Sequence, residues 1–289
     1  MQKMTNSNIS EISKEKCFCK NEFAPLKKVL TAPPLHMQID EAINETQKFY
    51  IRENIDRVEA RRQYSYFIQV LQEEVVEVIE LPVKKSLPEQ VFTRDTGFVI
   101  GGKLFISSMA ENIRKGETAI LKKWLKDHNI YYRQLPSKME GGDIIVEEDT
   151  LWIGMSDRTS HQTIKSLKKE LPDYTINTVE LDSNVLHLDC VFNTVDRDTA
   201  IVYPPAINPD SYRLLRRKFD LIEVTSDEQF HMGPNVLSIG NKTVISLPEN
   251  KQLNRKLRSS GFHVREIPFS EIIKSGGSFR CCTLPLVRK

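Results

Sequence analysis

Short apolar segments rich in β-branched residues recur along the chain, and a polar residue or a cysteine stands at the head of each. The segment headed by Asp95 continues as Thr-Gly-Phe-Val-Ile-Gly-Gly-Lys-Leu-Phe-Ile, with an apolar stretch on either side of Gly101-Gly102. Two such stretches around a glycine turn are typical of a β-hairpin. Segments of this kind begin at Asp95, Asp143, Asp189, Asn235 and Cys281.

The five head residues lie at nearly equal spacings of 48, 46, 46 and 46 residues. After each of the first four segments, apolar residues recur at intervals of three or four, which predicts a helix, and a further apolar stretch predicts a third strand. Turns are expected at 101–102, 148–149, 196–198 and 240–242, helices at 119–125, 164–171, 214–219 and 253–257, and third strands at 131–135, 177–181, 221–224 and 264–267. The chain therefore repeats a strand–strand–helix–strand unit.

The fifth unit is divided between the two ends of the chain. Its hairpin begins at Cys281, and the N-terminal part supplies a strand at 26–30, a helix at 57–74 and a strand at 76–80. Joining the first and last units closes a ring and removes open sheet edges. We therefore predict an α/β fold, a five-bladed α/β propeller, with residues 17–289 as a single catalytic domain and residues 1–16 as a disordered tail.

A closed ring brings the equivalent residue of every unit to one central space. Those residues are the head residues, so three carboxylates, one amide and the Cys281 thiol are expected to face the axis. A carboxylate-rich space with one thiol suits a positively charged substrate that is attacked by sulfur.

Composition narrows the classes of partner. Basic and acidic residues number 41 and 39 and are well mixed, which gives no reason to expect nucleic acid or an anionic membrane as the partner. No apolar run approaches the roughly 20 residues of a membrane span, and the first 16 residues contain no apolar signal-peptide core, so we expect a cytoplasmic protein. Five cysteines are an odd number, and Cys17 and Cys19 lack a second pair of ligands, so neither a disulfide framework nor a metal or other cofactor is expected.

The repeat register selects Cys281 as the inward-facing nucleophile. If the segment is a strand, Cys282 points to the opposite face and is a small buried residue. A thiol with a pKa of about 8.5 is mostly protonated at neutral pH and needs a base or a nearby cation. His187 stands two residues before Asp189 in an expected strand, so both would project to one face, and histidine is the natural proton shuttle near neutrality.

The substrate class follows from the acids around this space. A planar guanidinium matches carboxylates in bidentate fashion, and Asp95, Glu140 and Asp189 could grip it while its central carbon stays open to sulfur. Glycines 141 and 142 between Glu140 and Asp143 would allow close backbone approach. Arg114 and Arg158 each follow a hairpin near a helix start and could hold a substrate carboxylate.

Several motifs together resemble the guanidino-group-modifying superfamily of arginine deiminases, dimethylarginine dimethylaminohydrolases and amidinotransferases. They are Phe92-Thr93-Arg94-Asp95, Glu140-Gly141-Gly142-Asp143, Gly154-Met155-Ser156-Asp157-Arg158-Thr159, His187-Leu188-Asp189-Cys190-Val191-Phe192 and Gly277-Ser278-Phe279-Arg280-Cys281-Cys282-Thr283-Leu284-Pro285. The resemblance implies a five-bladed α/β propeller.

The resemblance also implies a mechanism and a set of site residues. Cys281 attacks the guanidinium carbon, His187 protonates the departing amine, and a thiouronium intermediate on sulfur is hydrolysed to citrulline or a related ureido product. Glu140 and Asp189 complete the expected catalytic set. The expected substrate-binding set, which shares Asp189 with it, comprises Asp95, Asp143, Asp189, Arg114 and Arg158.

The activity within the superfamily stays open at this point. The short chain favours a dimethylarginine-dimethylaminohydrolase-like hydrolase of N-methylated arginine or arginine, whereas Phe-Thr-Arg-Asp and Glu-Gly-Gly-Asp look more like the deiminase motifs. The alternatives are an arginine deiminase proper, an amidinotransferase with an amine acceptor, and a non-catalytic binding propeller. A small guanidino molecule is the expected partner, the protein is expected to be a monomer or a homodimer, and residues 40–56 are a candidate lid.

Overall fold

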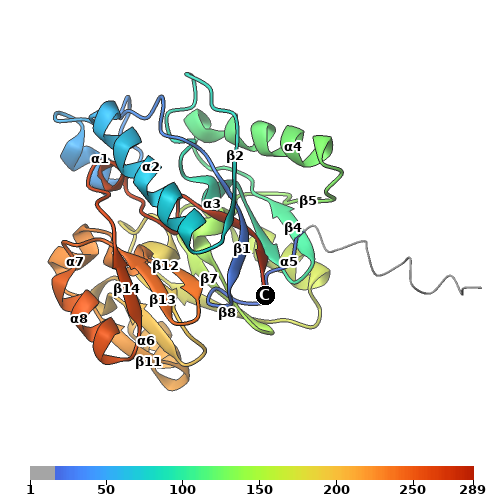
Figure 1. Ribbon diagram of the computed structural model, residues 1–289. Helices are drawn as coiled ribbons and strands as arrows, with labels where there is room; N and C mark the ends of the chain where they lie inside the picture. The colour runs from blue at the N-terminus through green and yellow to red at the C-terminus, as the bar shows by residue number, and fades with distance from the viewer. Residues whose placement is uncertain (1–16) are drawn as a thin grey trace, which may run out of the picture.

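Five three-stranded sheets surround a common axis in the computed structural model, which describes residues 17–289 (Figure 1). Each sheet corresponds to one repeat, so the predicted α/β propeller is confirmed. The expected tail of residues 1–16 lies outside the described residues.

All five sheets share one pattern: the middle strand pairs antiparallel with one neighbour and parallel with the other. The antiparallel neighbours are the most buried strands, namely β3 (Gly97–Ile100), β6 (Ile144–Glu147), β9 (Phe192–Thr194), β12 (Leu237–Gly240) and β15 (Leu284–Arg288). The middle strands are β1 (Leu26–Thr31), β4 (Lys103–Ile106), β7 (Thr150–Met155), β10 (Thr199–Val202) and β13 (Thr243–Ser246). The more exposed parallel neighbours are β2 (Glu77–Glu80), β5 (Arg133–Gln134), β8 (Thr175–Glu180), β11 (Asp220–Glu223) and β14 (His263–Glu266).

The split fifth unit forms as expected. Strand β15 from the C-terminus pairs antiparallel with β1, with Leu30 opposite Leu284, and β1 pairs parallel with β2. Strand β5 is shorter than the expected 131–135, because only Arg133 and Gln134 pair with β4 and Tyr131 is 72% exposed.

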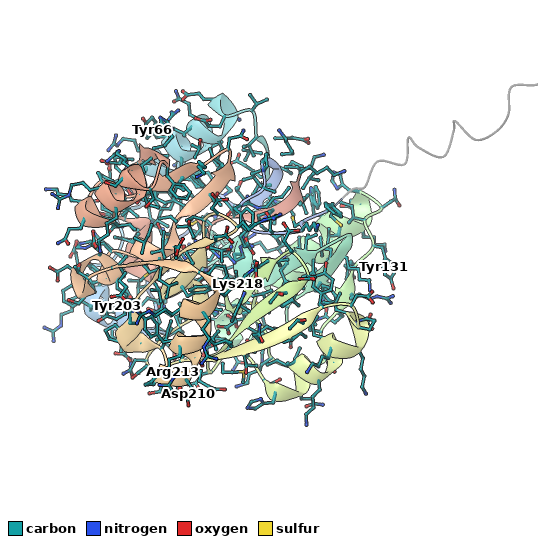
Figure 2. All side chains as sticks on the ribbon, turned by 90° about the horizontal axis from the view of Figure 1, so that it is seen from below. Tyr66, Tyr131, Tyr203, Asp210, Arg213 and Lys218 are labelled. Carbon is teal, nitrogen blue, oxygen red and sulfur yellow. The ribbon has the colours of Figure 1, made fainter. Side chains whose placement is uncertain are left out.

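The predicted helices lie on the outside of the ring (Figures 1 and 2). They are α2 (Arg57–Glu73), α4 (Glu117–Asp127), α5 (His161–Glu170), α6 (Pro209–Lys218) and α8 (Lys251–Ser259). The carboxylate of Asp56 caps α2 by accepting hydrogen bonds from the amides of Val58 and Glu59. Buried side chains then recur at helical spacing along α2, whereas Tyr66 on its outer face is exposed at the periphery of Figure 2.

The head residues lie in short helical turns before the inner strands, so the expectation that His187 and Asp189 share a strand is wrong. Asp95 belongs to α3 (Thr93–Thr96), and the next three heads belong to the 3-10 turns η4 (Gly141–Asp143), η5 (Leu188–Cys190) and η7 (Gly233–Asn235). Local side-chain bonds explain the turns: Asp143, for example, accepts a hydrogen bond at 2.9 Å from the Leu188 amide that a strand would need for its ladder.

These turns contact one another in succession around the axis, α3 with η4, η4 with η5 and η5 with η7. The axial placement of the heads is therefore confirmed even though their local structure differs from the expected strand. Cys281 also lies in a turn, just before β15, and both Cys281 and Cys282 are buried within the largest apolar cluster of the protein.

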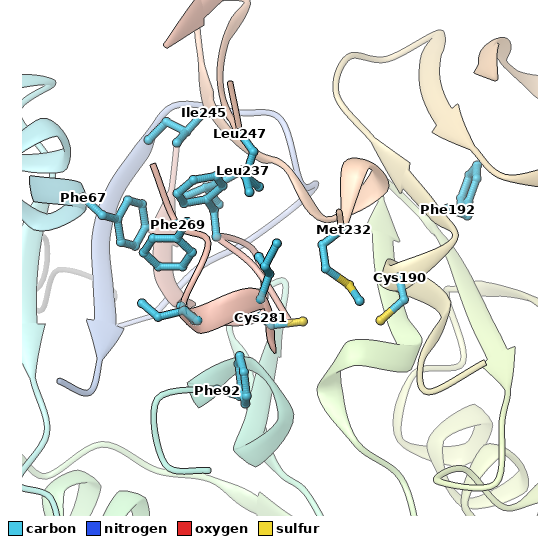
Figure 3. Close-up of a cluster of buried hydrophobic side chains, with 14 of the residues drawn as sticks. Phe67, Phe92, Cys190, Phe192, Met232, Leu237, Ile245, Leu247, Phe269 and Cys281 are labelled. Atoms are coloured by element: carbon cyan, nitrogen blue, oxygen red, sulfur yellow. The ribbon is translucent and has the colours of Figure 1, made fainter. Parts of the chain in front are cut away.

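Apolar side chains fill the space between blades and helices, and Figure 3 shows the part of this core around Phe67 and Phe269. Within residues 17–289, none of the helices combines the length and the apolar character that crossing a bilayer requires.

Candidate active site

Cys281 is held in one orientation by the neighbouring units. Its sulfur accepts a hydrogen bond at 3.0 Å from Nδ2 of Asn235, and its backbone amide donates to Oδ1 of the same side chain at 3.1 Å. The two carboxylate oxygens of Asp189 lie 3.6 and 3.7 Å from the sulfur. The thiol therefore has one polar donor on one side and a carboxylate on the other.

His187 lies in a fully buried pocket between two carboxylates. Its Nε2 donates to Oε2 of Glu140 at 2.9 Å, and its Nδ1 lies 3.6 Å from Oδ1 of Asp95. Neither Nδ1 of His187 nor Oδ1 of Asp95 has a hydrogen-bond partner among the described residues. A buried donor and a buried acceptor thus face each other and are available to a third group.

The electrostatics of this pair favour a protonated imidazole. Burial alone would lower the pKa of His187, but the negative charge of Asp95 and the hydrogen bond to Glu140 outweigh it and raise the pKa to about 10. Burial likewise pushes the pKa of Glu140 upward, yet the contacts with His187, Arg114 and Arg158 hold it at about 2. At neutral pH the two residues form an imidazolium–carboxylate pair.

The Cys281 thiol is neutral at rest. Burial raises its pKa well above the usual value, and a hydrogen bond with Cys190 and the charge of Asp189 raise it further. A guanidinium next to the sulfur would supply the positive charge that stabilises the thiolate. The site therefore combines a charged imidazole with a neutral thiol whose ionisation a neighbouring cation would favour.

Gly142 permits the close packing of these groups. A Cβ atom on Gly142 would lie 2.7 Å from the His187 ring and 2.9 Å from Asp95. Gly141 is equally restricted, because a Cβ there would lie 2.1 Å from the carbonyl oxygen of Arg94. The two glycines between Glu140 and Asp143 are thus required by the approach of α3 and His187 to the η4 turn.

Asp95 and Arg114 form a buried ion pair. Nη1 of Arg114 donates to Oδ2 of Asp95 at 2.6 Å, and its remaining donors bond to Glu117 and to the carbonyl of Phe92. These charges raise the pKa of Arg114 despite the opposing effect of burial. Arg114 lines the small cavity beside Cys281, but in this arrangement it orients Asp95.

Asp143 supports the site from outside that cavity. Its carboxylate accepts hydrogen bonds from Ser156, Thr159 and the Leu188 amide, at 2.5, 2.7 and 2.9 Å. Burial raises its pKa to about 6, partly offset by His187 and these donors. Asp143 of the η4 turn therefore connects this turn to η5 and to the segment that carries Arg158. Its predicted role in substrate binding stays a prediction.

Arg158 has an unused donor near the site. Its Nη2 donates to the Ile43 carbonyl at 2.7 Å, whereas Nη1 lies 3.9 Å from Glu140 and makes no hydrogen bond within the described part of the chain. Arg158 also lines a polar cavity of about 310 Å³ together with Lys48, Glu111 and Asn184. Of the two predicted arginines, Arg158 has the more open surroundings for a substrate carboxylate.

The candidate lid lies directly over this space, although its helical part is only α1 (Glu45–Tyr50). The side chain of Asn44 donates to the carbonyl of Ser275 at 3.0 Å. Gln47 is fully buried and donates to Glu89 at 2.9 Å and to the Ser275 hydroxyl at 2.7 Å. These bonds tie residues 44–47 to the loop that precedes the nucleophile.

Asp189, beside the Cys281 sulfur, is linked through Arg280 to Glu22. Nε of Arg280 lies 3.3 Å from its Oδ2, and Nη1 of Arg280 donates to Glu22 at 2.5 Å. Burial raises the pKa of Asp189, and Arg280 opposes that effect. The ion pairs with Arg280 and Arg94 outweigh burial at Glu22 and lower its pKa to about 2.

Sequence reasoning placed the catalytic candidates together but missed two contributors. The repeat predicts that Asn235 faces the axis, but not that its side chain donates a hydrogen bond to the Cys281 sulfur. The repeat register, which places Asn235 beside Cys281, is the signal from which this contact could have been predicted. Glu89 lines the cavity beside Cys281, and burial raises its pKa to about 7. Nothing in its sequence context distinguishes Glu89 from an exposed glutamate.

Asp95, Glu140 and His187 are the group whose geometry could hold a metal ion. One ligand atom from each lies within 4.8 Å of the others. Binding a metal would require the imidazole to lose its proton, and the raised pKa of His187 opposes that. Cys17 and Cys19 are buried and belong to no disulfide within the described residues, and burial raises the pKa of Cys19 to about 12.

Sequence comparison places this architecture among known proteins. Residues 33–288 match the model of a family described as eukaryotic N,N-dimethylarginine dimethylhydrolase. The chain is 50% identical over 277 residues to protein YkgA of Bacillus subtilis, covering 96% of this chain and 97% of YkgA. It is 26% identical over 265 residues to the bifunctional arginine dihydrolase/ornithine cyclodeaminase ArgZ of Synechocystis, covering 89% of this chain but 37% of ArgZ.

Solved structures show the same likeness. The N-terminal domain of ArgZ, crystallised as a point mutant with substrate, aligns with a TM-score of 0.84 and 26% identity, over 90% of this chain and 98% of that domain. The amidinotransferase SxtG of Microseira wollei aligns with a TM-score of 0.82 at 18% identity, over 95% of this chain and 98% of SxtG, which shows a shared fold.

Proposed function

Because the chain belongs to the family described as eukaryotic N,N-dimethylarginine dimethylhydrolase, we propose that it is a cysteine-dependent hydrolase of N-methylated arginine or arginine. The reaction replaces the terminal amine of the guanidino group with oxygen, giving citrulline and ammonia, methylamine or dimethylamine. ArgZ, a relative with the same fold, has been crystallised with its substrate and is described as an arginine dihydrolase, which supports a substrate of the arginine type.

One observation carries the proposal. The free acceptor Oδ1 of Asp95 and the free donor Nδ1 of His187 face each other in a buried space, and Asp95 lines one cavity with Cys281. The cavity measures about 10 Å³ and has to widen to admit a guanidinium, which would then give an N–H to Asp95 and to Asp189 while its central carbon lies next to sulfur. Its positive charge would stabilise the thiolate that burial disfavours.

The chemical steps follow from these protonation states. The Cys281 thiol gives its proton to Asp189, whose Oδ2 lies 3.6 Å from the sulfur, and the thiolate forms a bond to the guanidinium carbon. The imidazolium of His187 gives its proton to the departing nitrogen, the C–N bond breaks, and a thiouronium remains on sulfur. Neutral His187 then takes a proton from water as it attacks, and the C–S bond breaks to release the ureido product.

Glu140 acts through His187 in this scheme. Its carboxylate keeps the imidazole protonated and fixes the orientation of the ring, so that Nδ1 faces Asp95. Arg158 and the backbone of the lid are proposed to hold the α-carboxylate and α-amino ends of the substrate, at the polar cavity that Ile43, Asn44 and Arg158 line together.

A substrate panel tests the proposal. The protein is incubated with arginine, monomethylarginine and asymmetric dimethylarginine, each with and without glycine as an amine acceptor, and citrulline and ornithine are quantified. Citrulline formed without an acceptor supports hydrolysis. Turnover that requires the acceptor would assign an amidinotransferase instead, and an absence of turnover and of binding to all three would contradict the proposal.

A further inference from the structure

A second thiol stands beside the nucleophile and has no role in the hydrolysis. Cys190 belongs to the η5 turn, directly after Asp189, and is 3% exposed. Its sulfur lies 3.7 Å from Oδ1 of Asp189, and the Cys281 sulfur lies at the same distance from the same oxygen atom. The Cys190 thiol is also among the neighbours that raise the pKa of Cys281.

Figure 3 shows the two side chains from different parts of the chain with their sulfur atoms pointing toward one another. Both cysteines are free. Cys282, the sequence neighbour of the nucleophile, lies instead close enough to Tyr64 of α2 to affect the pKa of that residue. The pair that the fold brings together is therefore Cys190 with Cys281.

A cavity that opens to the surface lies against Cys190, one member of this pair. Cys190 and Gly276 line a cavity of about 450 Å³ together with Phe49, Phe230 and Met232. Phe49 is 68% exposed, so the cavity extends to the surface. Hydrogen peroxide is close to water in size and needs no larger path than the substrate does.

We propose that Cys190 is a resolving cysteine, which converts a peroxide-oxidised Cys281 into a reversible Cys190–Cys281 disulfide. In the first step the Cys281 thiol gives its proton to Asp189 as its sulfur attacks hydrogen peroxide, the O–O bond breaks, and sulfenic acid and water form once the departing hydroxide takes up that proton. In the second step the sulfur of Cys190 attacks the sulfenic sulfur, the S–O bond breaks and water leaves. In total, two thiols are oxidised and one peroxide is reduced to two waters.

Asp189 is placed to take part in the second step. Its Oδ1 is 3.7 Å from both sulfurs, so it can accept the proton of Cys190 as the S–S bond forms and return it to the departing hydroxide. The disulfide removes the nucleophile and protects it from irreversible oxidation to sulfinic acid. A thiol reductant restores both groups.

The test uses the full-length protein and does not depend on its substrate. The protein is treated with hydrogen peroxide at pH 8.5, digested with trypsin without reduction, and analysed by mass spectrometry. The expected product is the peptide that contains Cys190 joined to the peptide that follows Arg280, lighter by two hydrogens and separated by dithiothreitol. Cys281 and Cys282 fall in one tryptic peptide, so the same experiment on Cys282→Ala assigns the bond.

The Cys190→Ser variant supplies the second readout. Without a resolving thiol, the peptide that carries Cys281 is expected to gain two oxygens, and dithiothreitol does not remove them. Circular dichroism checks that each variant is folded. The proposal is overturned if the cross-link is absent from folded wild type and from folded Cys282→Ala. It is also overturned if Cys281 in Cys190→Ser reaches the same dithiothreitol-reversible state as in wild type. Because these readouts are masses, they are independent of whether the proposed hydrolase activity is found.

Discussion

Nε2 of His187 lies 2.9 Å from Oε2 of Glu140, and both side chains are completely buried. This contact, together with the charge of Asp95, keeps the imidazole protonated in a place where burial alone would discharge it. In the proposed reaction the histidine therefore acts as an acid, and the substrate supplies the charge that activates sulfur.

The Glu140→Gln variant should lower the pKa of His187, because a neutral amide no longer stabilises the imidazolium. His187 is protonated at every pH below its raised pKa, so activity should be lost as the pH rises through that pKa. In the variant this alkaline loss should move down by about 1 to 3 pH units, and kcat should fall roughly a hundredfold or more. The pH profile of kcat/KM for the best substrate of the panel measures both.

The matched control for this variant is Glu170→Gln, since Glu170 is an exposed glutamate at the end of α5 that contacts Arg133. Its pH profile should equal that of wild type. An alkaline limb that stays in place in Glu140→Gln would show that Glu140 does not set the protonation of His187.

Arg158 and Arg114 should respond differently to replacement by alanine. Arg158→Ala removes a proposed carboxylate contact, so KM should rise about 10- to 100-fold, the equivalent of about 1.5 to 3 kcal/mol, with a smaller change in kcat. Arg133→Ala, an exposed arginine outside the site, is the control. Unchanged KM in Arg158→Ala would remove this residue from the substrate-binding set.

Arg114→Ala leaves Asp95 and Glu117 buried without their counter-charge. We expect a loss of about 3 to 5 kcal/mol in the free energy of unfolding, measured by urea denaturation. A stable Arg114→Ala protein with raised KM would instead assign Arg114 to the substrate carboxylate, as the sequence resemblance implies.

The axial residues could be found from sequence because the repeat spacing is a global signal. Four near-equal intervals placed Cys281 in register with Asp189 and Asn235, and the structure brings these three residues into contact. The same apolar pattern misled the local assignment of His187 and Asp189, because the 3-10 turn depends on the bond between the Leu188 amide and Asp143, 45 residues away.

Contacts of that kind carry no local pattern and explain what else was missed. Glu22 lies 258 residues from Arg280 in the sequence, and Gln47 lies 228 residues from Ser275. The sequence predicts Arg114 near the start of a helix. That its guanidinium donates its hydrogen bonds to Asp95 and Glu117 follows only from the packing of α3 on α4.

Glu22 should make the stability of the protein pH-dependent in acid. Its folded-state pKa of about 2 is below the ordinary value near 4.5, so its contribution is complete above pH 4.5 and is lost as pH falls toward 2. The variant Glu22→Gln should be less stable than wild type by about 3 to 5 kcal/mol at pH 7, because Arg280 and Arg94 lose their partner.

The difference in unfolding free energy between Glu22→Gln and wild type should narrow between pH 5 and 2, since wild type also loses this charge there. The exposed Glu59→Gln serves as the control, because Glu59 pairs with Arg62 at the surface of α2. A constant difference across this pH range would contradict the assigned ion pair.

The most direct measurement concerns the sulfur atom that attacks the guanidinium. Wild-type protein is mixed with the best substrate of the panel, quenched in acid within one turnover, digested and analysed by mass spectrometry, with Cys281→Ser and Cys282→Ser in parallel. The account predicts an adduct on Cys281 with the mass of the substrate minus its departing amine, present in wild type and in Cys282→Ser and absent from the inactive Cys281→Ser. An adduct on Cys282, or full turnover by Cys281→Ser, would contradict it.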